Sequence, residues 1–160
     1  ESFDIMIAAF DGKPTSFSDN KYNAAWKISK YDGALIFGEM VYHKDKSFST
    51  SCYKLGFYYH TGYSEIDDDT DQLSTVFSKN YGFYLLTNNT IIRTGDRSIG
   101  VFSQFAYSPP SINTHNLYLG VGANVKGLVK KKPDTEFGIA LAFADFKNQK
   151  RHSHETTLEF

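Results

Sequence analysis

The sequence predicts an all-β fold, an antiparallel up-and-down transmembrane β-barrel, from three observations. Residues 116–125 and 135–143 alternate without a break between apolar side chains and small or polar ones, which is the period of a β-strand. The small and polar positions hold almost no Lys or Glu, although a soluble barrel shows water a polar exterior. The chain has 14 Phe and 11 Tyr against 1 Trp, an excess that suits the aromatic girdles of a membrane barrel. These patterns predict apolar groups facing lipid and small or polar groups facing a lumen.

About eight strands follow one another as a meander, separated by turn residues, and no helical period of useful length interrupts them. In the third strand, residues 53–59 alternate cleanly between apolar or aromatic residues and a second, more polar set. The fourth is ambiguous, because residues 85–86 and 91–92 put apolar groups on both faces. A further short strand within residues 22–30 is an alternative to a loop there. The expected strands span residues 3–10, 34–43, 51–61, 82–93, 97–107, 116–127, 135–146 and 155–160.

The connections between these strands sort into two kinds that alternate along the chain. Outer-membrane barrels have short periplasmic turns and long extracellular loops, so we place the short connections in the periplasm and the long ones outside. The short set comprises residues 44–50, 94–96 and 130–134. The longer set comprises residues 11–32, 62–81, 108–115 and 147–154.

The bulk composition excludes several classes of function. The 160 residues suffice for a single domain, which we expect to span residues 1–160. No run of about 20 apolar residues occurs, so we expect no membrane-spanning helix. The formal net charge of -1 leaves no basic face to neutralise phosphates, so we expect no nucleic-acid partner. Cys52 is the only cysteine and cannot form an internal disulfide. Because no nucleophile, metalloprotease or phosphate-loop motif is present, we expect neither an enzyme nor a cofactor.

Two polar clusters raise the question of metal binding. His152 and His154 would share one face of a strand and could hold Zn²⁺ with Glu155 nearby, but no other ligand is assigned and we expect a polar external loop. Residues 67–71 hold four Asp. A calcium-binding EF-hand loop that began at Asp67 would need Gly at its sixth position and Glu at its twelfth, where this chain has Gln72 and Ser78. We expect a solvated external loop there, with the collection of divalent cations near the lipopolysaccharide surface as the alternative. No metal site is assigned.

A family resemblance lies in GALIFGEMVYH (33–43), YKLGFYYHTG (53–62), YGFYLLTNNTIIR (81–93), SIGVFSQFAYSPPSINTHNLYLGVGANVKGLV (98–129), KPDTEFGIALAFADF (132–146) and HETTLEF (154–160). Together these segments resemble the carbohydrate-selective porins of the OprB type, in the same order and over most of the chain. The resemblance implies a bacterial outer-membrane barrel of about 16 strands. It also implies a water-filled pore that admits small sugars, glucose among them, by passive diffusion. Residues 1–160 would then be part of a larger barrel, with further strands on either side. Three consecutive Lys at 130–132 depart from the family pattern, which has a single basic residue in that turn.

The alternation also predicts which polar side chains line the lumen. A pore binds sugars weakly, through planar hydrogen-bonding groups and flat rings, so that release stays easy. Lys and Glu on opposite walls would create a transverse field that orients dipolar solutes. Arg93 and Arg97 flank a short turn, and the family lines its constriction with basic residues. The lumen candidates by parity are Lys54, Tyr58, Gln104, Asn116, Tyr118, Asn124, Lys126, Glu136, Glu155 and Glu159.

Two other functions stay open beside the sugar porin. One is a small closed barrel of about eight strands that encloses a single ligand, although inward-facing residues such as Gly56, Gly120 and Ala140 would leave voids there. They fit better along a wide lumen or against an internal loop. The other is a structural or adhesive barrel of the outer membrane. The expected partners are small sugars, outer-membrane lipid and lipopolysaccharide, and further copies of the chain in a homo-oligomer.

Overall fold

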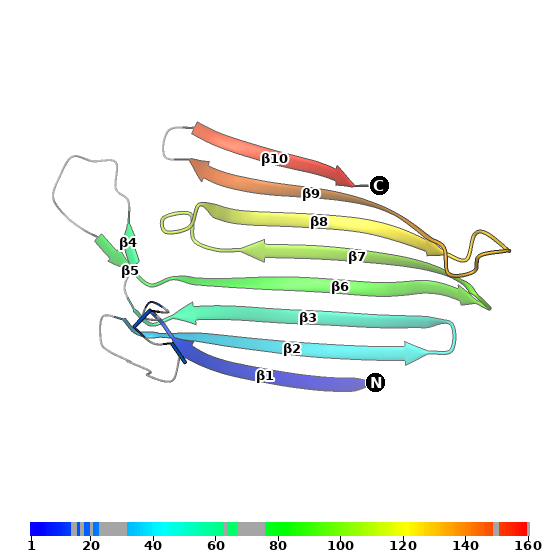
Figure 1. Cartoon of the computed structure of the whole chain (residues 1–160), viewed down its shortest axis with the longest axis horizontal. Helices are drawn as coiled ribbons and strands as arrows, with labels where there is room; N and C mark the ends of the chain where they lie inside the picture. The colour runs from blue at the N-terminus through cyan, green and yellow to red at the C-terminus, as the bar shows by residue number, and fades with distance from the viewer. Residues whose placement is uncertain are drawn as a thin grey trace.

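The computed structural model describes residues 1–13, 16, 18–19, 21–22, 32–62, 64–66, 76–148 and 151–159, and within these only the backbone of residues 64–66, 76–78, 147–148 and 151–159. The chain forms an 8-stranded sheet in the order β1-β2-β3-β6-β7-β8-β9-β10, in which each neighbouring pair is antiparallel (Figure 1). This is the predicted up-and-down meander. The strands are β1 (Ser2–Asp11), β2 (Ala34–Lys46), β3 (Ser49–His60), β4 (Ser64–Ile66), β5 (Val76–Ser78), β6 (Tyr81–Thr94), β7 (Arg97–Tyr107), β8 (His115–Lys126), β9 (Glu136–Asn148) and β10 (Arg151–Glu159).

Every strand of the large sheet was expected from the alternation, and its bounds differ by a few residues. The short hairpin of β4 and β5 was not expected, because three-residue strands carry too little alternation to be recognised. The alternative strand within residues 22–30 lies outside the described residues, apart from Tyr22.

The predicted alternation of short and long connections is wrong in two places. The β8–β9 connection, residues 127–135, is longer than the β7–β8 connection, residues 108–114. The second place is the expected long loop of residues 147–154, where β9 continues to Asn148 and Arg151 pairs with it at the start of β10. Polar side chains suggested a loop there, but the backbone ladder continues because its hydrogen bonds do not depend on side-chain polarity. We call the end with residues 47–48, 95–96 and 127–135 the turn end, and the opposite end the loop end.

The register defines two faces. Glu39, Gly56, Tyr84, Ala106 and Tyr118 lie side by side across β2, β3, β6, β7 and β8, on the face that we call inward. Every second residue from these along each strand shares that face. The register resolves the ambiguity of β6: Leu86 is an apolar residue on the inward face, opposite Lys54 and Gln104, and residues 91–92 are explained by a register shift between Thr90 and Ile92. One residue is inserted there, so Ile92 pairs with Ile99 on the outward face while Arg93 pairs with Ser98 on the inward face.

The outward face carries a continuous apolar surface. Residues such as Leu55, Leu85, Leu119 and Ile139 are 43–52% exposed. A soluble protein rarely leaves so large an apolar patch uncovered, so this surface calls for lipid or a partner. No helix among the described residues is long and apolar enough to cross a membrane.

Two polar residues of the outward face bond to each other across neighbouring strands. Thr87 and Ser103 lie opposite one another on β6 and β7, and their hydroxyl oxygens are 2.9 Å apart in a hydrogen bond. In lipid, each polar group must find its partner within the protein, and this pair meets that requirement.

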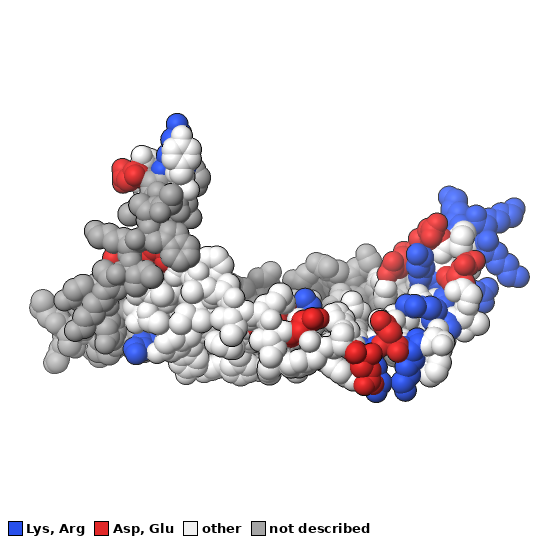
Figure 2. Space-filling model, turned by 90° about the horizontal axis from the view of Figure 1, so that it is seen from below, with Lys and Arg blue, Asp and Glu red and all other residues white. Residues whose placement is uncertain are grey.

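Charged side chains gather at the turn end. Figure 2, which shows the molecule from the β1 edge, has most of its Lys, Arg, Asp and Glu there, with a largely uncharged surface along the strands. Lys126 pairs with Asp134 at 3.4 Å, and Lys44 pairs with Glu1 at 3.4 Å. The hydrogen bond from Lys44 and its positive charge lower the pKa of Glu1. The charges thus mark the border of the apolar surface.

Candidate functional site: the inward wall of the sheet

Glycines on the inward face lie beneath larger side chains of the neighbouring strand. Gly56 is directly opposite Tyr84, and a Cβ at Gly56 would collide with the tyrosine ring. Gly82 is covered by Tyr58 in the same way, and Gly122 by Phe102. Covering a strand glycine with a cross-strand aromatic ring protects exposed backbone and fixes the register. Voids were expected above inward glycines only for a small closed barrel, and in the structure the rings of Tyr84 and Phe102 occupy the space above Gly56 and Gly122.

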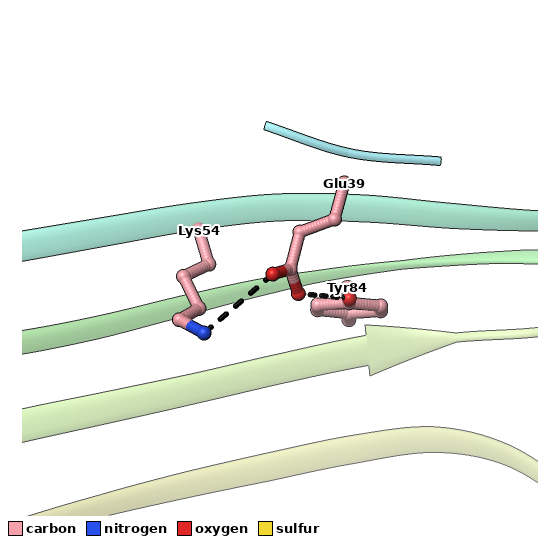
Figure 3. A network of polar contacts seen from close by, with 3 residues as sticks. All are labelled: Glu39, Lys54 and Tyr84. Atoms are coloured by element: carbon pink, nitrogen blue, oxygen red, sulfur yellow. Dashed lines mark hydrogen bonds and ion pairs between the residues drawn. The ribbon is translucent and has the colours of Figure 1, made fainter. Parts of the chain in front are cut away.

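Tyr84 reaches across β3 to a charged pair. Its hydroxyl donates a hydrogen bond to Oε2 of Glu39, and Nζ of Lys54 lies 3.5 Å from Oε1 of the same carboxylate (Figure 3). The side chains of Lys54 and Glu39 are 39% and 19% exposed, so water still reaches both. The carboxylate, the ammonium and the phenol therefore form a charge-neutral cluster on the inward wall, with hydrogen-bonding capacity left over.

A second polar network lies at the loop end. The hydroxyl of Tyr58 donates to Oδ1 of Asn80 over 3.1 Å. The side-chain amides of Asn80 and Asn113 exchange two hydrogen bonds, of 3.0 and 2.9 Å, and Asn113 also donates to the carbonyl of Pro109. This network ties the β7–β8 connection to the segment that precedes β6.

Three further candidates lie in the middle of the sheet or at its loop end. Tyr118 lies along its own strand, with its hydroxyl 3.2 Å from where a Cβ of Gly120 would be. Gln104 pairs with Gly120 on the neighbouring strand. Asn116 is the inserted residue of a register shift between His115 and Leu117, so its predicted parity does not apply, and it donates to Oδ2 of Asp145 over 3.2 Å.

The remaining described candidates lie toward the turn end. Asn124 donates a hydrogen bond to Glu136 on β9, and Glu136 pairs in register with Lys126. Arg93 is on the inward face and donates to Oγ1 of Thr50 over 3.3 Å. Arg97 differs, because it pairs with Thr94 at the turn and its parity is opposite to the inward row.

Several residues that the sequence singled out are not described at the level of their side chains. Glu155 pairs with Ala144 and Glu159 with Ala140 in the backbone register, but their side chains lie outside the described part. The same holds for His152 and His154, and residues 67–71 lie wholly outside it. Among the described residues, no group of three or more His, Cys, Asp or Glu could hold a metal ion.

Two residues of the central cluster were missing from the sequence-based candidates. Glu39 was not among the lumen candidates, and Tyr84 was missed because the parity of its strand was ambiguous. The pairing of Gly56 with Tyr84 indicates a ring that covers the glycine, but it can be recognised only once the register is known.

The fold and its two faces define the class of protein. An antiparallel meander with an outward apolar surface and a polar inward wall is typical of a transmembrane β-barrel of the bacterial outer membrane. Residues 1–157 match the carbohydrate-selective porin family, OprB, and the chain belongs to this family.

A solved structure has the same fold. The high-pH structure of Pseudomonas putida OprB superimposes with a TM-score of 0.75 at 21% sequence identity, over 90% of this chain and 37% of that one. The chain thus spans little more than a third of the length of that porin. No curated protein sequence matches the chain.

Proposed function

We propose that this chain forms part of the wall of an outer-membrane channel that lets small neutral sugars such as glucose diffuse passively into the periplasm. The cluster of Glu39, Lys54 and Tyr84 carries the proposal. It offers hydroxyl-binding groups of both polarities and an aromatic ring, while its charges cancel and so hold no ion strongly. Such a wall favours a polar uncharged solute and releases it easily.

The remaining sequence-based expectations extend this proposal. The sheet would continue into a larger barrel past β1 and β10, the turn end would face the periplasm, and the loop end would face lipopolysaccharide. Other copies of the chain could join in a homo-oligomer. The lumen candidates toward the turn end, including Lys126 and Glu136, would then line the periplasmic part of the pore.

Liposome swelling tests the proposal directly. The complete natural protein that contains this chain, reconstituted in liposomes, should cause rapid swelling in glucose and slower swelling in a trisaccharide. An Ala142→Trp variant places a large ring on the inward face and should slow swelling in glucose. Leu141→Trp, one residue away on the outward face, should leave it unchanged. Absence of swelling in every sugar would reject the channel and leave the structural or adhesive barrel.

A further inference from the structure

A hollow of about 300 Å³ lies on the inward face toward the loop end. This volume is at the lower end of the range of small-ligand pockets, about 300–1,000 Å³. Its lining includes Tyr58, Tyr84, Ala106, Asn116, Tyr118 and Ala144. Of the four tyrosines that line it, Tyr58, Tyr84 and Tyr118 are on the inward face, as are the small residues Ala106 and Ala144.

The position of the rings keeps the space above Ala106 open. Ala106 lies directly between Tyr84 and Tyr118 in the cross-strand row, so the two tyrosine backbones are two strand spacings apart, about 10 Å. Tyr84 leans away from Ala106, across Gly56 to the Glu39 carboxylate. Tyr118 lies along its own strand toward Gly120. Neither ring covers Ala106.

Gly56 determines this arrangement. Any side chain at this position would collide with the ring of Tyr84 and push it back from β3 toward its other neighbour, β7, where Ala106 is located. The Glu39 hydrogen bond holds the far end of the same ring. The opening above Ala106 therefore depends on the absence of a side chain two strands away.

We propose that the hollow is a binding subsite for one hexopyranose and that Gly56 is a positioning residue that keeps it open; this inference rests on the proposed function. The apolar C–H face of the sugar lies against the tyrosine rings above Ala106. The sugar hydroxyls meet the side chains that border the rings, the Asn116 amide on one side and the spare capacity of the Glu39–Lys54 pair on the other. The result is a saturable site within the diffusion path.

Sugar titrations on single channels test the subsite. The complete natural protein, inserted in a planar bilayer, should show an ion current that falls and saturates as glucose is added. Ala106→Leu fills the space above this position and should raise the half-saturating glucose concentration at least about fivefold, the size of one lost aromatic contact. Gly56→Val should do the same by displacing Tyr84, and Tyr84→Leu by removing the ring.

Ala140→Leu is the matched control, because Ala140 is also a small inward-facing residue but lies opposite Gly122, outside the lining of the hollow. It should leave the half-saturating concentration unchanged. Heat-modifiable gel migration verifies folding, and if Gly56→Val does not fold, Ala106→Leu and Tyr84→Leu decide the matter. A current that never saturates with glucose, or an Ala106→Leu variant that binds like the natural protein, would overturn the subsite. If the natural protein still swells liposomes in glucose, the channel function stands without it.

Discussion

The two faces of the sheet follow different rules, although they alternate along the same strands. On β8 and β9, the outward residues Leu119, Val121 and Leu141 are exposed and share only their apolar character. On the inward face, Gly122 fits beneath Phe102, and Asn124 bonds to Glu136. The outward face therefore specifies a class of side chain, whereas the inward face specifies individual pairs.

This difference follows from what each face contacts. Lipid tails are fluid and adapt to any apolar shape, so only polarity and depth matter on the outward face. The inward residues instead contact one another across neighbouring strands, as the ring of Phe102 does over Gly122. We consequently expect that polar substitutions destabilise the outward face and that oversized side chains destabilise the inward face.

The largest effect is expected from a charge on the outward face. Leu119→Arg or Ile139→Arg should lower the free energy of unfolding by about 2–4 kcal/mol if these positions lie near the middle of the bilayer, because the guanidinium must be buried in lipid. Urea unfolding of the complete protein in phospholipid vesicles, followed by gel migration, measures this cost.

Ala140→Arg is the control for that prediction, since Ala140 neighbours Ile139 but faces inward. Its cost should stay below about 1 kcal/mol, because the arginine extends into water. Equal losses at Ala140 and Ile139 would mean that both faces contact the same medium, and the membrane assignment of the outward face would fail.

A smaller effect is expected from collision on the inward face. Gly122→Val places two methyl groups where the Phe102 ring lies, and its Cβ would also be 2.9 Å from the carbonyl oxygen of Ile139. Overpacking of this kind costs about 1–3 kcal/mol. The same vesicle unfolding assay should detect it as a lower urea midpoint with an unchanged slope.

Gly138→Val provides the comparison, because a Cβ at Gly138 meets nothing closer than 3.5 Å. This variant should be neutral or slightly stabilising, since valine favours strands. If both glycines tolerate valine equally, the covering of Gly122 by Phe102 does not contribute to stability.

The outward face and the strand order could be predicted from the sequence because each depends on local alternation. Around Leu119 and Ile139, every second residue is apolar, and this pattern can be recognised without knowing which strands pair. The cluster on the inward wall could not be predicted, because it joins Glu39, Lys54 and Tyr84 on three strands through a register that the sequence does not state. The parity of β6, and with it Tyr84, was hidden by the inward-facing apolar residue Leu86 and by an inserted residue between Thr90 and Ile92.

Connection lengths could be predicted only in part, for a similar reason. The polar residues from 147 onward suggested a loop, yet the pairing of Asn148 with Arg151 continues the sheet. Side-chain polarity marks where a strand leaves the apolar belt, and backbone pairing decides where the strand ends. These two borders coincide on β7, which ends at Tyr107 as predicted, and not on β9.

The smallest change in stability, with a clear change in function, is expected at the charged pair of the inward wall. Lys54→Met leaves the Glu39 carboxylate with Tyr84 as its described hydrogen-bond donor, and the wall gains one net negative charge. Because the pair is partly exposed, the loss of stability should be about 1 kcal/mol or less.

The pore of the Lys54→Met variant should become more selective for cations, and Glu39→Gln should shift the selectivity toward anions. Reversal potentials across a KCl gradient measure both shifts. Leu55→Met, on the outward face beside Lys54, should shift neither, because it changes no charge and contacts no permeating ion. Shifts of the same sign in the two charge variants would place the pair outside the ion path, and the inward face would then not be the lumen wall.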